Sequence, residues 1–187
     1  MTYLPTSLVG KTVIMRSLSE DDLEQLYALE TDESVKQYVG GPVKKRREEW
    51  IAGMSRSLGQ SRQPLCVTAK ATGDFAGRAS LSYPGLPLEE SELQVLIARR
   101  YWRSGFGYEV SELLISAAFD RLGARSVVAV VHPENTASRK MCEKLGFVFD
   151  AIKRYPAGQE RWDHEHHILK LPSKHHGPRR FPQLMPK

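Results

Sequence analysis

The sequence is poor in cysteine and contains no long hydrophobic run. Only Cys66 and Cys142 occur among its 187 residues, far apart and without the spacing of metal ligands. This usage favours two buried free thiols in a reducing compartment. No apolar stretch approaches the length of about 20 residues that crosses a bilayer, and the N-terminus lacks the basic segment and apolar core of a secretion signal. We therefore expect a cytoplasmic protein that does not bind membranes.

The composition is that of an ordinary soluble globular protein. Hydrophobic residues make up 41% and charged residues 26% of a chain whose length suits one domain with a substantial core. We expect this domain to span residues 8–171. A tail rich in Pro, His, Lys and Arg follows it at residues 172–187.

The chain carries a moderate surplus of positive charge, with a net charge of +5 and a pI near 9.2. Such a surplus suits a polyanionic cofactor or an acidic partner, and it equally suits plain solubility. Charge alone also permits nucleic-acid binding, but a zinc-knuckle spacing, an aromatic RNA-binding signature and a strongly basic helix are missing from the sequence. We interpret the basic run at residues 44–47 as the solvated start of a helix, with partner binding as the alternative.

The first half of the chain predicts short strands and two helices. Ser19, with Asp22 three residues later, is typical of a capping box at the start of a helix. The remaining elements expected in this half are a strand at 13–17, a helix at 45–57, a strand at 65–69, a hairpin turn at 71–74 and a returning strand at 75–83.

The second half predicts strands that alternate with helices. An apolar strand at 92–97 leads to a glycine pair, and an amphipathic helix at 110–122 leads away from it. The run at 126–131 is rich in β-branched valine and indicates an interior strand parallel to the first. Asn135 is well placed to cap a helix at 136–145, and strands at 147–152 and 159–171 follow. The fold class predicted is therefore α+β, with a single mixed, mostly antiparallel sheet flanked by helices.

Gly105 and Gly107 lie between a predicted strand and a predicted helix. Two glycines there let the backbone approach a ligand closely, and the start of the helix adds the positive end of its dipole. The pattern indicates an anion site. Because glycine also marks many ordinary turns, the pair by itself is equally compatible with a simple connection.

Ser138 falls on one helical face with Met141, Cys142 and Leu145. That face is mostly apolar, and a hydroxyl on a buried face needs a partner. Ser138 could bond back to a carbonyl of its own helix. Alternatively, it could border a ligand cavity beside the glycine loop.

Several segments together resemble the GCN5-related N-acetyltransferase (GNAT) superfamily, in particular its ribosomal-protein-alanine acetyltransferase-like (RimJ/RimL-like) branch. The resemblance extends over residues 8–171 in order and spacing. The segments that carry it are 13–18 with Asp21 and Asp22, 38–42, 72–77, 101–109, 135–138 and 144–147.

This resemblance implies that acetyl-CoA is the cosubstrate and that no metal takes part. Backbone N–H groups of the loop would cradle its pyrophosphate, the main chain near Leu96 and Ile97 would pair with its pantetheine arm, and Asn135 and Ser138 would lie along that arm. Arg139 and Lys140 could meet phosphates or form a solvated helix face. The loop residues expected to bind the cofactor are Trp102, Arg103, Ser104, Gly105, Phe106, Gly107 and Tyr108.

The resemblance further implies direct transfer of acetyl to a primary amine in a ternary complex. The acceptor would be a protein N-terminus or a small molecule, and the enzyme a monomer or homodimer. Many relatives carry a Tyr as thiolate proton donor where this sequence has Cys142, so Ser138 is the replacement candidate. Glu92 is the candidate base, against the alternative of a surface residue at a strand end. Asp32, Glu33 and Asp163 could hold a cationic acceptor.

Other functions are carried as alternatives. A regulatory module could bind acetyl-CoA without turnover, which the missing Tyr permits, and a basic nucleic-acid-binding protein would use the run at 44–47. Cys142 could accept acetyl covalently, although no His partner is evident. His164, His166 and His167 alternate as on a strand, but no third metal ligand is indicated elsewhere.

Overall fold

The computed structural model describes residues 7–59, 64–82, 90–153 and 166–173. Parts of two predicted strands (83 and 159–165) and the tail from residue 174 lie outside the described residues. The described strands form one sheet of eight strands in the order β1-β2-β3-β4-β5-β6-β8-β7. Their bounds are β1 Ser7–Val9, β2 Val13–Ser17, β3 Leu65–Ala69, β4 Phe75–Ser82, β5 Glu90–Ile97, β6 Ser126–Val131, β7 Val148–Lys153 and β8 His166–Pro172.

The sheet is mixed and mostly antiparallel, which confirms the predicted fold class. Only β5 and β6 pair in parallel among the described strands, and their ladder joins Glu90–Glu92 to Ser126–Val128. Beyond the pair of Glu92 and Val128, the described parts of the two strands are no longer paired with each other. The sheet therefore opens between β5 and β6, near its middle, and this opening positions the site.

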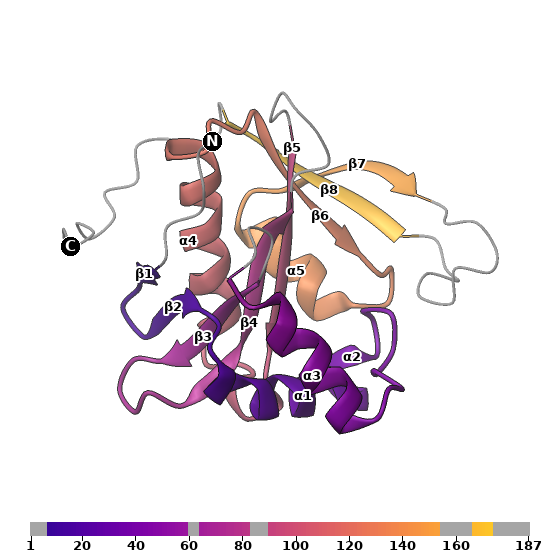
Figure 1. Cartoon of the computed structure of the whole chain (residues 1–187). Coiled ribbons are helices and arrows are strands. Elements are labelled where there is room, and N and C mark those ends of the chain that lie inside the picture. The colour runs from indigo at the N-terminus through magenta and orange to yellow at the C-terminus, as the bar shows by residue number, and fades with distance from the viewer. Residues whose placement is uncertain (1–6, 60–63, 83–89, 154–165, 174–187) are drawn as a thin grey trace.

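Helices cover both faces of the sheet. The short helices are η1 Glu20–Asp22 and η2 Arg99–Tyr101, and the α-helices are α1 Leu23–Thr31, α2 Glu33–Lys36, α3 Arg47–Ser57, α4 Phe106–Asp120 and α5 Thr136–Lys144. Figure 1 shows α1, α2 and α3 gathered at the lower half of the sheet, with α4 beside the strands. None of the helices in the described part of the chain is long and apolar enough to cross a membrane.

Two hydrophobic clusters fill the two faces. Adjacent residues of β3 enter different clusters: Val67 packs with α4 and α5, whereas Cys66 packs with α1 and α2. Because successive side chains of a strand point to opposite faces, this alternation separates an α4/α5 side from an α1–α3 side. The α4/α5 side holds the larger cluster.

Local sequence signals account for the ends of the helices. Ser19 and Asp22 form the predicted capping box, although the first turn after it is the short helix η1. Asn135 caps α5 by accepting a hydrogen bond from the Ser138 N–H at 3.1 Å. The helix predicted at 110–122 begins earlier, at Phe106, because Gly105 adopts φ 87° and serves as its N-cap. Glycine takes this left-handed conformation without steric cost.

Candidate active site

The edge of β5 that faces β6 is exposed to the opening in the sheet. The Ala98 N–H donates to the Ala76 carbonyl of β4 at 2.8 Å, and Leu96 pairs with Arg78 of β4. Since main-chain groups alternate in direction along a strand, those of Leu96 face β4. The main-chain N–H and C=O groups of Val95 and Ile97 face the opening instead. Val95 is not among the residues that the sequence predicts to bind the cofactor.

The loop between β5 and α4 is folded back onto the end of β5. The Trp102 indole Nε1–H donates to the Ile97 carbonyl at 2.8 Å, and the Ser104 hydroxyl donates to the Tyr101 carbonyl at 2.5 Å. Arg103 has φ 63°, an unusual left-handed conformation for a side chain other than glycine. The glycine loop is thus a tight, internally bonded turn and not an extended linker.

The first turn of α4 leaves donors directed away from the helix. The first intrahelical bond after the cap is that from the Glu109 N–H to the Gly105 carbonyl, at 3.0 Å. The N–H groups of Phe106, Gly107 and Tyr108 therefore lack acceptors within the helix, as at every helix start. A Cβ built on Gly105 would meet no atom within 4 Å, so the space in front of this turn is open. This arrangement can bind an anion.

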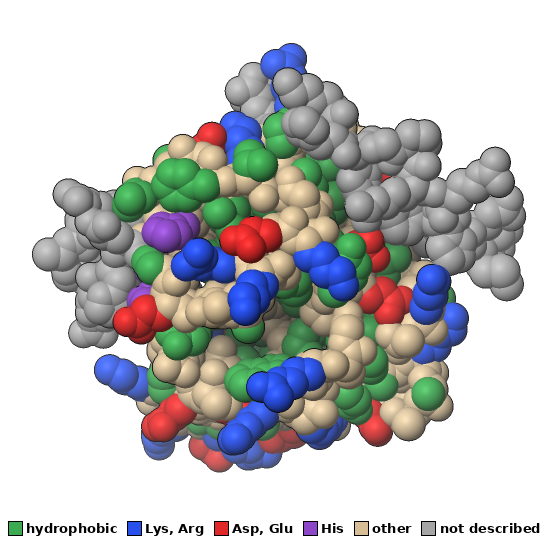
Figure 2. All heavy atoms as spheres, turned by 180° about the vertical axis from the view of Figure 1, so that it is seen from behind, with side chains coloured by type: hydrophobic (Ala, Val, Ile, Leu, Met, Phe, Trp, Pro, Cys, Tyr) green, Lys and Arg blue, Asp and Glu red, His purple; other side chains and the backbone are tan. Residues whose placement is uncertain are grey.

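Helix α5 packs against the same turn. A Cβ on Gly107 would lie 3.5 Å from Met141 Sδ, and Lys144 Nζ lies 4.6 Å from the centre of the Tyr108 ring. The structure therefore packs the loop at 102–108 against the second half of α5, the helix whose first half carries Ser138. Figure 2 shows the molecule from behind, where the surface is hollowed and Lys and Arg side chains stand on both sides of the hollow.

Ser138 and Cys142 are neighbours on the inner face of α5. Ser138 is half-buried and lies one helical turn before the buried Cys142. Cys142 is 1% exposed, and burial raises the pKa of its thiol to about 11. The thiol is therefore protonated at neutral pH, which argues against Cys142 as a covalent acetyl carrier.

Glu92 lies on the opposite face of the sheet from Ser138. Leu93 and Val95 belong to the α4/α5 cluster and Leu96 to the α1–α3 cluster, so Glu92 faces the α1–α3 side. Its Oε1 accepts a hydrogen bond from Gln94 Nε2 at 3.1 Å. It stands at the last β5–β6 pair, where the opening begins. The two predicted catalytic side chains thus approach the opening from different faces.

A buried ion cluster lies on the α1–α3 side, and the sequence patterns did not predict it. Glu30 Oε2 lies 2.7 Å from Lys36 Nζ, and the second oxygen of Glu30 bonds to Arg78 Nε. Side-chain exposure is 1% for Lys36 and 8% for Glu30. Burial by itself would raise the pKa of Glu30, but the charges of Arg78 and Lys36 outweigh it and the pKa is lowered. One signal was present: Glu30 lies on the apolar face of its helix, and a carboxylate there needs partners.

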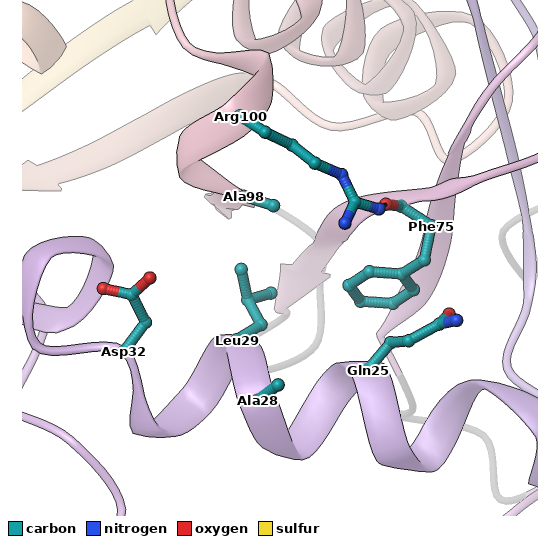
Figure 3. A pocket seen from close by; sticks show the side chains of 7 residues that line it. All are labelled: Gln25, Ala28, Leu29, Asp32, Phe75, Ala98 and Arg100. Carbon is teal, nitrogen blue, oxygen red and sulfur yellow. Dashed lines mark hydrogen bonds between the residues drawn. The ribbon is translucent and has the colours of Figure 1, made fainter.

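A small hollow of about 160 Å³ lies at the end of α1 (Figure 3). Asp32 borders it and caps α2, accepting from the Ser34 N–H at 2.8 Å and the Val35 N–H at 3.2 Å. The hydrogen bond from the Ser34 hydroxyl is the main cause of its lowered pKa. Arg100 reaches the Phe75 carbonyl at 2.6 Å on the far side (Figure 3). Asp32 thus has a structural task, while Glu33 is exposed and Asp163 lies outside the described residues.

An aromatic cluster joins the residue after β6 to the turn after α2 and to β8. The His132 ring lies 5.1 Å from Tyr38 and 5.6 Å from His166, between ring centres. The Glu134 N–H donates to His132 Nδ1 at 3.1 Å, so the neutral imidazole carries its proton on Nε2. Across the part of the chain that the structure describes, no three His, Cys, Asp or Glu side chains are grouped to hold a metal ion. His164 lies outside that part.

Comparison with known proteins identifies the family. The acetyltransferase (GNAT) domain matches residues 12–148. The uncharacterized N-acetyltransferase YoaA of Bacillus subtilis (strain 168) is 25% identical over 146 residues, which are 76% of this chain and 82% of YoaA.

Two solved structures resemble the fold. The structure of a GNAT-family acetyltransferase from Bacillus anthracis superposes with a TM-score of 0.77 at 18% identity, covering 90% of this chain and 99% of that one. The spermidine N-acetyltransferase from Vibrio cholerae, in complex with CoA and spermine, gives 0.74 at 15% identity, covering 88% and 98%. The chain belongs to the GNAT family of acetyltransferases, and it is an acetyl-CoA-dependent acyltransferase whose acceptor is an amine.

Proposed function

We propose that this protein transfers acetyl from acetyl-CoA directly to the primary amine of a protein N-terminus or a small molecule, within a ternary complex. The observation that carries the proposal is the opening between β5 and β6. A helix start that could bind an anion lies beside it, and a carboxylate stands at its narrow end on the opposite face of the sheet. Cofactor and acceptor could therefore meet through the sheet without a covalent enzyme intermediate.

The cofactor would lie along the loop and the exposed edge of β5. We assign the pyrophosphate to the backbone N–H groups from Arg103 through Tyr108, which follow Trp102 in the loop. The pantetheine arm would pair with Val95 and Ile97 as an added strand does at a sheet edge, with Val95 taking the place first assigned to Leu96. Asn135 Oδ1 already caps α5, so we assign its amide nitrogen to the same arm.

The proposed chemistry needs one base and one proton donor. An ammonium group, with a pKa of about 8 at a protein N-terminus and about 10 in an alkylamine, must lose its proton before it attacks. We assign this step to Glu92, directly or through water. The amine nitrogen then bonds to the thioester carbon, the carbon–sulfur bond breaks, and the thiolate takes up a proton. We assign that proton to the Ser138 hydroxyl, which would be reprotonated by the second proton that the nitrogen loses as it becomes an amide.

The first test is a pair of matched glycine variants. Gly105→Asp should abolish acetyl-CoA binding in calorimetry, because it puts a side chain and a negative charge where the pyrophosphate would lie. Gly123, at the other end of α4, has φ 67° and equally open surroundings. Gly123→Asp is therefore a control for backbone strain and should retain the affinity. Undiminished affinity in Gly105→Asp would remove the pyrophosphate assignment.

The second candidate function, a module that binds acetyl-CoA without turnover, is tested by thiol release. Acetyl-CoA is offered with a panel of amines, aminoglycosides and N-terminal peptides. Acetylation of any acceptor class supports the transferase, whereas tight cofactor binding without turnover on the whole panel favours the regulatory module.

Nucleic-acid binding receives little support from the basic run. Arg47 pairs with Glu24 and with Glu48, and Lys45 lies 3.9 Å from Glu49. These carboxylates offset much of the positive charge that phosphate contacts would need.

We also propose that the transferase domain spans residues 8–171, since β1 and β8 are both integral to the sheet.

A further inference from the structure

One carboxylate joins the first hairpin of the chain to the first turn of α4. Glu109 accepts from the Lys11 N–H and from the Thr12 hydroxyl in short contacts, and from the Thr12 N–H at 3.1 Å. Lys11 and Glu109 are 98 residues apart in the sequence. The turn between β1 and β2 thus presents three donors to a single side chain.

The turn is shaped to admit this carboxylate. Gly10 N–H donates to the Val13 carbonyl at 2.8 Å, which closes the turn. A Cβ on Gly10 would come within 2.2 Å of Glu109 Oε1, so any larger residue would displace the carboxylate. Lys70 Nζ donates to the Gly10 carbonyl at 3.0 Å and ties the same turn to the end of β3.

Glu109 also has a definite place on α4. It is the residue after Tyr108, and its own N–H makes the first intrahelical bond after the cap. The N–H groups of the three residues before it are among those proposed to bind the pyrophosphate. Any rotation of this turn would change where those donors point, and hydrogen bonds to a charged group restrain it strongly.

We propose that Glu109 is a positioning residue for the cofactor, which holds the first turn of α4 in its binding orientation by anchoring it to Gly10, Lys11 and Thr12. The β1–β2 hairpin, which contributes nothing to the cofactor edge itself, thereby becomes part of the cofactor site. The inference rests on the proposed function in one respect, namely that acetyl-CoA binds at this helix start.

Two effects of Glu109 on an anionic cofactor oppose each other. Its negative charge repels the pyrophosphate, so that removing the charge would tighten binding. Its hydrogen bonds fix the donors, so that removing them would weaken binding. The repulsion is screened at this half-exposed position, whereas the charge-assisted hydrogen bonds are short-range and direct. We expect the anchoring effect to be the larger.

The test measures acetyl-CoA affinity and steady-state kinetics in the full-length protein. Glu109→Gln should raise the Kd and KM for acetyl-CoA about tenfold while kcat and the acceptor KM change less than about twofold. Thr12→Val removes the hydroxyl donor but leaves the carboxylate, and should act in the same direction by about threefold. Asp120→Asn is the matched control. Asp120 lies at the far end of α4 and accepts a hydrogen bond from the Ser116 hydroxyl of the same helix at 2.6 Å. Among the described residues, this is the hydrogen bond that its side chain makes. It should leave all constants unchanged.

The outcomes separate the two levels of the proposal. An unchanged or lowered Kd in both Glu109→Gln and Thr12→Val overturns the positioning role, even if the melting temperature falls. If Glu109→Gln does not fold, the Thr12→Val affinity decides alone. A wild-type protein that does not bind acetyl-CoA would overturn the proposed function, and this inference with it.

Discussion

On each side of the sheet one carboxylate joins a helix to a strand or turn far away in the sequence, and the two carboxylates differ in their surroundings. Glu109, on the α4/α5 side, is half-exposed and bonds mainly to backbone donors of a turn. Glu30, on the α1–α3 side, is buried and bonds to the charged side chains Lys36 and Arg78. On the α4/α5 side the carboxylate therefore acts mainly through directional hydrogen bonds to backbone groups. On the α1–α3 side it acts through ion pairs with buried cations.

The difference matters because burial changes what the loss of a partner costs. When one member of a buried ion cluster is removed, the remaining charges are left without compensation and without water. At a half-exposed position, solvent replaces the lost hydrogen bonds. We therefore expect mutations in the Glu30 ion cluster to act mainly on stability and those at Glu109 to act mainly on affinity.

The largest effect should come from Glu30→Ala. It leaves Lys36 and Arg78 buried without their counter-ion, and should lower the free energy of unfolding by about 3–5 kcal/mol. The measurement is urea denaturation followed by circular dichroism. Glu24→Ala is the control, since Glu24 pairs with Arg47 at the surface and should cost at most about 1 kcal/mol. Equal losses in the two variants would break the comparison between buried and exposed carboxylates.

An intermediate effect is expected from acid on the α1–α3 side. Asp22 is 4% exposed. Burial opposes its ionisation, but the Arg16 guanidinium, 2.6 Å away, and Ser19 lower its pKa from 3.8 to about 2. A lowered folded-state pKa means that the stabilisation is present above pH 4 and is lost as the pH falls towards 2. The shift corresponds to about 2 kcal/mol.

The measurement for Asp22 is the free energy of unfolding between pH 5 and pH 2, compared with Asp22→Asn. The variant should be less stable at pH 5 and should lose less stability on acidification than the wild-type protein. Parallel pH profiles for the two proteins would show that this carboxylate is not the titrating group.

The smallest effect on stability should come from Ser138→Ala, which tests chemistry on the α4/α5 side. Loss of the proposed proton donor should lower kcat on the order of a hundredfold, with the acetyl-CoA Kd and the melting temperature nearly unchanged. Cys142→Ala is the neighbouring control and should retain turnover, because its protonated thiol has no proposed role. If Ser138→Ala weakens binding and turnover equally, Ser138 is a binding residue only.

Much of the α4/α5 side could be predicted from the sequence because its signals are local. Asn135 and the Ser138 N–H that it caps are three residues apart, and Gly105 sets the start of α4 through its own backbone conformation. The parallel pairing of β5 with β6 also followed from an apolar strand, a helix and a β-branched strand in succession. Such signals act within a few residues and survive without knowledge of the rest of the fold.

The α1–α3 side was less predictable. Lys36 is a residue type that is seldom buried, and its sequence neighbours give no sign that Glu30 and Arg78 enclose it. The choice between Leu96 and Val95 at the sheet edge depended on register, which a shift of one residue would reverse.

The sequence by itself determined the order of the elements, the glycine turn before α4 and the cap of α5, since backbone conformation and capping depend on adjacent residues. Only the tertiary structure decided that Glu109 bonds to a turn 98 residues away, that Lys36 is buried against Glu30, and that Glu92 and Ser138 stand on opposite faces of the sheet. These facts depend on long-range packing, where burial and strand register, and not local preference, choose the partners.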